Sequence, residues 1–231
     1  HAARRMWRRR LGDCSLQNVE REILRIERQG DVPSYLIPQI WLDYLHTRDA
    51  RRLKPVFYHH QMDILSLVAL TAHLAQAMAV PDGRGFAHAE DRVSLLRLHY
   101  TQKRYDEVVA LADKVLDDLE DTVHRGHCLE MLATAAKRCA QWQVMESAWR
   151  RLCAEFPRHL SARLELAKHY EHRTRDLARA EAICLEAMSI YEGSRIVHEH
   201  ELRAEAFAYR LERIRRKRMG RNDLLESGRC I

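Results

Sequence analysis

The second half of this chain repeats one helical pattern three times. Each repeat places small or apolar residues at helical spacing, and a second amphipathic segment precedes it. The repeated stretches are residues 103–116, 141–153 and 175–188, preceded by 91–101, 126–139 and 161–171. The matched positions Val108, Met145 and Ala180 are 37 and 35 residues apart. One such helix pair cannot cover its own apolar face, so this pattern favours pairs of helices that stack on one another.

The repeat resembles the tetratricopeptide repeat. That family places an aromatic residue or Leu after the inter-helix turn, followed by small or apolar residues at i, i+4 and i+7. Leu166, Ala167 and Tyr170 fit the pattern, whereas Arg92 and Leu96 depart from it in the first repeat. The resemblance implies an α-solenoid whose groove binds a protein partner. The alternative, from the residues alone, is an irregular helical bundle.

A last helix is predicted over residues 201–218, where it would cap the solenoid. We expect one apolar side on this helix, made by Leu202, Ala206, Tyr209 and Ile214. Five of the six residues from 213 to 218 are basic. Residues 219–231 are predicted to be a flexible tail.

The composition also favours helices. The chain has only 8 Gly and 5 Pro among 231 residues, which is few for a turn-rich β architecture. No apolar run approaches the ~18 residues of a transmembrane helix, so no membrane partner is expected. The net charge of +6 is compatible with nucleic-acid binding. Six Cys without a CxxC pair indicate reduced thiols and a cytoplasmic protein.

The first part of the chain is organised differently, with short helical segments and scattered aromatic residues. Ser15 is a natural N-cap for a helix over 15–24, residues 31–34 read as a loop, and Pro38 begins another helix. The clearest break is Pro81-Asp-Gly-Arg-Gly85, so we predict domains at 1–80 and 91–218 joined by a linker at 81–90. The chain lacks an initiator Met and a secretory signal, which indicates a fragment, a processed product or an isolated domain.

One pair of residues in the first part carries chemistry. His59 and Asp63 lie four positions apart at the start of an apolar helical run, which places both on one helix face. We expect Asp63 in the opening turns of that helix, where a negative charge is favourable. A His and a carboxylate on one ridge suit a metal-dependent nuclease, but they also suit an ordinary helix start.

Several further stretches resemble the RNase H-like exonuclease domain of YprB-type bacterial proteins, in the DEDD group of 3′–5′ exonucleases. The similar stretches are His1–Trp7, Leu11–Glu20, Asp31–Ser34, Ile37–Pro38, Tyr44–Leu45 and His59–Asp63. The last one is like the family's final His-Asn-x-x-Asp motif, with His60 in place of the Asn. The resemblance covers about a third of the chain, and family members often carry helical repeats after this domain.

The resemblance implies roles for these residues in an intact domain. Asp63 would be a ligand of Mg²⁺ or Mn²⁺, and His59 would orient or deprotonate the attacking water. The family's earlier acidic motifs do not occur here, and one carboxylate holds Mg²⁺ weakly, so we expect this chain alone to be inactive. Arg4, Arg5, Arg8 and Arg9 are candidates for phosphate contacts of DNA or RNA, or else they form a solvated face.

Two functions therefore stay open, and with them whether the chain is an enzyme. One is part of a metal-dependent 3′–5′ exonuclease followed by a repeat module. The other is a non-catalytic helical scaffold that binds a protein partner. The expected fold is mainly α in either case: a helical remnant of an α/β RNase H-like domain followed by a tetratricopeptide-like α-solenoid. Since that remnant would pack on a sheet that the chain lacks, we expect an exposed apolar face on residues 1–80.

Overall fold

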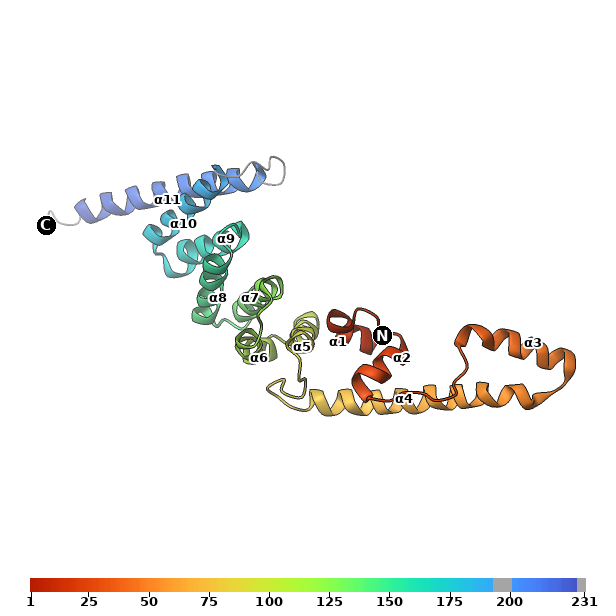
Figure 1. Cartoon of the computed structure of the whole chain (residues 1–231). Helices are drawn as coiled ribbons and strands as arrows, with labels where there is room; N and C mark the ends of the chain where they lie inside the picture. Colours follow the sequence, from red (N-terminus) through yellow and green to blue (C-terminus); the bar gives the residue numbers. More distant parts are fainter. Residues whose placement is uncertain (193–200, 228–231) are drawn as a thin grey trace. The chain divides into compact units, whose positions relative to one another are not determined.

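The structure is a computed structural model that describes residues 1–192 and 201–227, with the side chains of residues 1–190 and 205–219. Every regular element in this part of the chain is a helix or a helical turn (Figure 1), which confirms the mainly α fold. None of the described helices is both long and apolar enough to cross a membrane. The five cysteines described are free thiols. The chain divides into two compact units, His1–Leu98 and His99–Ile231.

The first unit is built from short helices around one long helix. Its elements are α1 (Ala2–Leu11), α2 (Leu16–Val19), the π-helical turn η1 (Glu20–Leu24), the 3₁₀ turns η2 (Ser34–Leu36) and η3 (Ala50–Leu53), α3 (Ile37–Thr47) and α4 (Lys54–Met78). Ser15 does precede a helix, as predicted. Its hydroxyl donates to the Asp13 carboxylate instead of capping the helix, because Asp13 is within 2.7 Å.

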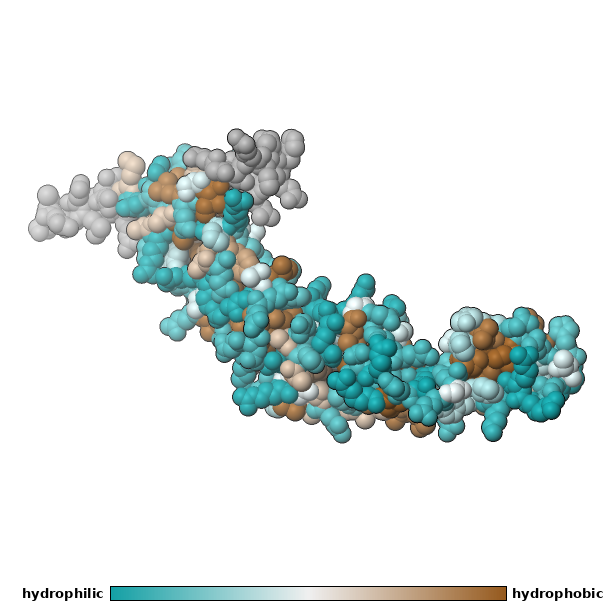
Figure 2. Space-filling view, in the orientation of Figure 1, coloured by the Kyte–Doolittle hydropathy of each residue, from teal (hydrophilic) through white to brown (hydrophobic). Residues whose placement is uncertain are grey.

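Helix α4 has two apolar faces and uses only one of them within this unit. The buried residues of α4 follow one another at intervals of seven, four and seven positions, so they share a face; they are His59, Ser66, Leu70 and Ala77. The opposite face carries Phe57 at 68% exposure, Ile64 at 50% and Val68 at 64%. Figure 2 shows apolar surface along α4 and over α3. A helix that is apolar on both sides is usually covered on both sides.

Helix α3 adds to this exposed apolar surface. None of its residues is buried, and Trp41 and Leu42 are 52% and 47% exposed. The expected exposed apolar face on residues 1–80 is thus confirmed, on α3 and on the outer side of α4. Helix α3 ends at Thr47 and is followed by Arg48, whose φ of 57° is left-handed, and α4 ends at Met78, three residues before Pro81.

The second unit has a solenoid-like arrangement of antiparallel helices. Helix α5 (Ala89–Thr101) leads into it from the first unit. The elements that follow are α6 (Tyr105–Asp117), α7 (Thr122–Arg138), α8 (Trp142–Glu155), α9 (Leu160–His169), the π-helical turn η4 (Tyr170–Thr174), α10 (Leu177–Glu192) and α11 (Glu201–Ser227). From α6 onward, each helix packs against the next one in the chain. This is how stacked helical pairs bury a continuous core.

The turns within the pairs repeat in register. Lys103, Ala140 and Arg175 each have a left-handed φ of 56–60° at the turn between two helices, and they are 37 and 35 residues apart. This spacing is the same as that of Val108, Met145 and Ala180, which are 0%, 2% and 0% exposed. A left-handed residue is uncommon where it is not glycine, so its recurrence marks the same turn used three times. Each of the three predicted units therefore has a left-handed residue at the same position of its turn.

The last helix differs from the prediction in two ways. Its buried residues are Phe207, Leu211 and Ile214, whereas Tyr209 is 63% exposed and Ala206 is also exposed. The predicted face was therefore wrong except at Ile214, because the positions four and seven after Phe207 define the packed side. The side chain of Leu202 lies outside the described residues. Helix α11 also continues to Ser227 instead of ending at 218, so much of the predicted tail is helical, and residues 228–231 are not described.

Candidate active site

Helix α4 places His59 and Asp63 on one ridge, as the spacing predicts. The His59 Nε2 atom lies 3.5 Å from Asp63 Oδ2. The helix, however, begins at Lys54, so Asp63 is in its third turn rather than in its opening turns. The favourable interaction with the helix N-terminus falls off within the first turn, and the dipole argument for Asp63 was therefore wrong. The charge of Asp63 is instead balanced by a side chain far away in sequence.

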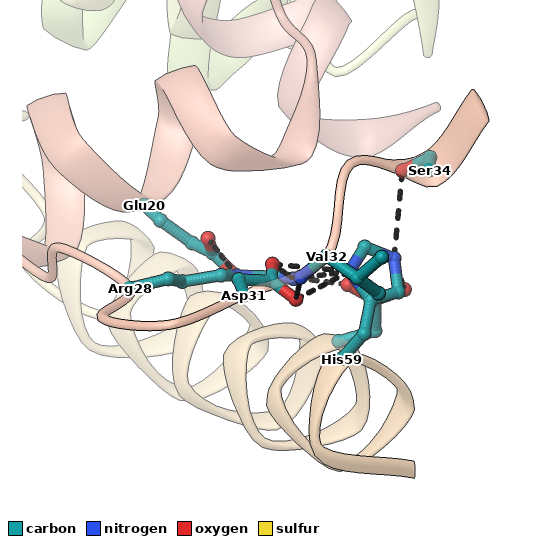
Figure 3. A network of polar contacts seen from close by, with 7 residues as sticks. Glu20, Arg28, Asp31, Val32, Ser34 and His59 are labelled. Carbon is teal, nitrogen blue, oxygen red and sulfur yellow. Dashed lines mark hydrogen bonds and ion pairs between the residues drawn. The ribbon is translucent and has the colours of Figure 1, made fainter. Parts of the chain in front are cut away.

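That side chain is Arg28, which lies between the carboxylates of Glu20, Asp31 and Asp63; Figure 3 labels the first two. Its guanidinium donates to both oxygens of Glu20, at 2.5 and 2.7 Å, to Asp31 at 3.0 Å and to Asp63 at 2.7 Å. The Arg28 side chain is only 5% exposed, and that of Glu20 only 1%. The planar fork of an arginine suits this role, because its donors can bind several carboxylates at once.

The loop before η2 holds the ring of His59 in place. The His59 Nδ1 atom lies 2.8 and 3.0 Å from the two Asp31 oxygens, closer than the 3.5 Å to Arg28 Nη1. An ionised carboxylate only accepts hydrogen bonds, so the shorter contacts place the ring proton on Nδ1. The Nε2 atom is then the basic nitrogen. Its neighbours, Ser34 Oγ and Asp63 Oδ2, are both 3.5 Å away, which is too far for a strong hydrogen bond.

Hydrogen bonds within this network shift the pKa values of Asp31 and Arg28 and so stabilise their charged forms. Burial opposes ionisation of Asp31, but hydrogen bonds from Arg28 and His59 outweigh it and lower the pKa of Asp31. The hydrogen bonds with Glu20, and then those with Asp63 and Asp31, raise the pKa of Arg28. At neutral pH, Asp31 is therefore a carboxylate and Arg28 a cation. With three carboxylates and one guanidinium, the cluster keeps a negative surplus when Glu20 and Asp63 are ionised.

The cluster does not by itself form a site for a divalent cation. One oxygen of Asp63 accepts from Arg28, and the Glu20 oxygens are both taken by the same guanidinium. Among the described residues, no three His, Cys, Asp or Glu side chains are arranged so that they could hold a metal ion. The Asp63 side chain, 34% exposed, is the most accessible carboxylate of the cluster. It is the one that a cation with other oxygen ligands could reach.

The four candidate arginines for phosphate contacts lie on the outer side of α1. Arg4, Arg5, Arg8 and Arg9 are all exposed, and they share the face opposite to the buried Met6 and Trp7. Arg10, in contrast, turns inward and forms an ion pair with Asp91, whose Oδ2 atom lies 3.0 Å from both Nε and Nη2 of Arg10. The predicted basic stripe therefore exists as a surface, and its role stays a prediction.

Three members of the network were not predicted as site residues: Glu20, Arg28 and Asp31. Glu20 closes the stretch Leu11–Glu20, and Asp31 opens the stretch Asp31–Ser34, so both belong to stretches that carry the family resemblance. A signal was available for Glu20, since an acidic residue four positions after Leu16 lies on the apolar face of its helix. Arg28 had none, because nothing local indicates which carboxylates it joins.

Comparisons with known proteins bear on the same region. Residues 2–75 match the protein-family model described as "RNase_H superfamily". The chain is also similar to "Uncharacterized protein YprB" of Bacillus subtilis (strain 168), with 25% identity over 222 residues. The alignment covers 94% of this chain and 51% of that protein, so the chain spans about half the length of this relative. No solved structure matches. At this coarse level, the region that contains His59 and Asp63 is similar to nuclease-like, nucleic-acid-binding domains of the RNase H superfamily.

Proposed function

We propose that this chain is part of a metal-dependent 3′–5′ exonuclease, in which α4 contributes the catalytic residues His59 and Asp63. The observation that carries the proposal is the Asp31–His59 pair, which leaves Nε2 as a base beside Asp63. Two facts support it: the match of residues 2–75 to the RNase H superfamily and the similarity to a relative about twice as long. The direction of attack, and the choice between DNA and RNA, come from the family resemblance alone.

His59 would act on the attacking water. In phosphodiester hydrolysis the water oxygen bonds to phosphorus while the leaving ribose oxygen departs, and the water proton has to be accepted. His59 Nε2 can take that proton, because Asp31 holds the Nδ1 proton and stabilises the imidazolium that forms. Only 10% of the His59 side chain is exposed, which keeps the ring in one orientation.

Asp63 would be one ligand of Mg²⁺ or Mn²⁺. Such an ion, when bound with further carboxylates, stabilises the charge that develops on the phosphate. The described residues do not supply those further carboxylates, so we propose that this chain alone does not hold the ion. The exposed arginines of α1 would contact the phosphates of the strand, and the repeats of the second unit, proposed to be tetratricopeptide-like, would bind a partner.

A second function is favoured by one observation. Arg28 already neutralises Asp63 and forms the centre of a buried ion network, as a purely structural cluster would. In that case the chain is a non-catalytic helical scaffold that binds a protein partner. The two functions predict different roles for His59: the exonuclease requires it as a general base, whereas the scaffold does not.

His59→Gln in the full-length gene product is expected to lower kcat for a labelled oligonucleotide by 10²–10⁴-fold, the usual contribution of a general base. His60→Gln is the matched control, since His60 is the next residue and is exposed. It should leave the rate within about twofold, in line with a surface change. Both variants should unfold at temperatures close to that of the wild type. An unchanged kcat in His59→Gln, or equal losses in the two variants, would favour the scaffold.

A further inference from the structure

Two pockets of the second unit share one lining residue, and one pocket has mostly apolar walls whereas the other is polar. The first, of about 430 Å³, lies between α7, α8, α9 and α11 and has mostly apolar walls around Trp142 and Met145. The second, of about 550 Å³, is polar and lies between η4, the start of α10 and α11. His172 lines both, so the two pockets adjoin at this residue, and we call their combined lining the His172 surface. Its two halves offer an apolar and a charged environment side by side.

The charge of this surface is positive. Its permanently charged cations are Lys137, Lys168, Arg173, Arg175, Arg210 and Lys217, and its carboxylates are Glu165 and Glu171. Each carboxylate is already shared. Glu165 accepts from Lys137 and from Lys168, both at 2.7 Å. With six cations and two carboxylates, most of the positive charge is not balanced within the surface, and it should attract anions.

The surroundings of Glu171 show the same excess of positive charge. Its side chain is completely buried and accepts from Arg210 at 2.5 Å, from Arg213 at 2.6 Å and from Lys217 at 2.7 Å. Three cations on one carboxylate leave a surplus of two charges at the wall of the polar pocket. The buried Nε of Arg210 has no hydrogen-bond partner among the described residues, and this side chain also lines the apolar pocket. A buried donor without a partner is costly.

The apolar half ends in a flat, charged platform. The Arg173 guanidinium lies 4.4 Å from the centre of the Trp142 ring, and the His169 ring lies 6.3 Å from the same ring at an interplanar angle of 21°. Arg173 is itself exposed. A guanidinium is planar, and an exposed one that lies over an aromatic ring offers a face on which a nucleic-acid base can stack.

We propose that the His172 surface binds single-stranded nucleic acid. A base would stack on the Arg173–Trp142 platform, and phosphates of the same strand would lie against Arg175 and Lys217. A nucleic-acid strand carries flat bases and anionic phosphates in alternation. The bases suit the apolar pocket, and the phosphates suit the basic pocket beside it. The carboxylates of an acidic peptide would pair with the cations, but they would not stack on the Arg173–Trp142 platform. The inference is independent of the nuclease proposal, because all its residues belong to the second unit.

The test measures fluorescence anisotropy of a labelled oligo-dT and a labelled oligo-U of ~20 nucleotides, long enough to exceed such a site. Arg173→Ala should weaken binding about tenfold, as the loss of one stacked base does. Lys217→Ala should weaken it several-fold and reduce the slope of log K against log salt by about 1. Arg216→Ala is the matched control, since Arg216 is the neighbouring residue, is 68% exposed and bonds Glu212 of its own helix.

Three results would overturn the proposal: no binding of either oligonucleotide by the wild type, equal losses in Arg216→Ala and Lys217→Ala, or unchanged binding in Arg173→Ala. Poly-glutamate that displaces the oligonucleotide at equal charge concentration would instead identify an acidic peptide as the ligand and also overturn it. Arg173 is a surface residue, so its variant should keep the wild-type circular dichroism. The test therefore stays valid even if Lys217→Ala destabilises the fold by removing one of the cations that bind Glu171.

Discussion

Arg28→Met is expected to lower the free energy of unfolding by about 3–5 kcal/mol at neutral pH, the usual effect of removing one partner from a buried ion pair. The substitution leaves Glu20, Asp31 and Asp63 close together with no cation among them. Met keeps most of the volume of the arginine stem, so the loss would be electrostatic rather than a packing defect. Chemical denaturation of the whole chain, followed by circular dichroism, measures it.

The pH dependence identifies the cause. In the wild type, the lowered pKa of Asp31 stabilises the fold above the ordinary Asp pKa, and this contribution is lost as the pH falls. In Arg28→Met the carboxylates repel one another, so protonation relieves them, and the difference between the two proteins should shrink towards pH 4. Arg52→Met is the control, because Arg52 is 69% exposed and pairs only with the surface Asp43. A loss that stays constant from pH 7 to pH 4 would contradict this account.

Glu171→Gln is expected to lower the free energy of unfolding by about 3 kcal/mol at neutral pH. Burial opposes ionisation of Glu171, but hydrogen bonds from Arg213 and Lys217 outweigh it and lower its pKa to about 2. Compared with the ordinary value of 4.5, this difference corresponds to about 3 kcal/mol. Because the folded pKa is depressed, this stability is present above about pH 5 and is lost as the pH falls towards 2.

Urea titrations at several pH values check this expectation. The wild type should lose stability between about pH 5 and pH 2 more steeply than Glu171→Gln, because the variant has lost the titrating group. Glu212→Gln, on the exposed side of α11, is the control and should behave like the wild type, since 70% of the Glu212 side chain is exposed. Parallel pH curves for the wild type and Glu171→Gln would show that another group is responsible.

The repeats were predictable because they depend on local rules. The period that aligns Val108, Met145 and Ala180 also fixes where the helices turn, and the left-handed residues at 103, 140 and 175 follow it. The limits of α6 to α10 were predicted to within about four residues for the same reason, whereas α11 extends nine residues beyond its predicted end. The face of α11 was not, because which side packs depends on α10 and η4, and the 201–218 pattern has apolar residues on more than one side.

The candidate site was only half predictable. His59 and Asp63 are four positions apart, so helix geometry alone brings them together. The Arg28 network joins residues that are three to 35 positions apart through the loop after η1, and no periodic pattern encodes the long-range contacts among them. The exposed apolar face was predictable from the resemblance to an α/β domain. The structure locates it on α3 and on the outer side of α4, because the inner side of α4 packs on η1.

The central claim is that Asp63 belongs to a nuclease site that this chain does not complete by itself. The most direct test follows a 5′-labelled single strand with Mg²⁺ or Mn²⁺ in three samples: the full-length gene product, its Asp63→Asn variant and this chain alone. The account predicts stepwise shortening from the 3′ end by the full-length product, a loss of at least ~100-fold in Asp63→Asn, and no products from this chain. Equal rates for Asp63→Asn and the wild type, or activity of this chain alone that Asp63→Asn abolishes, would contradict it.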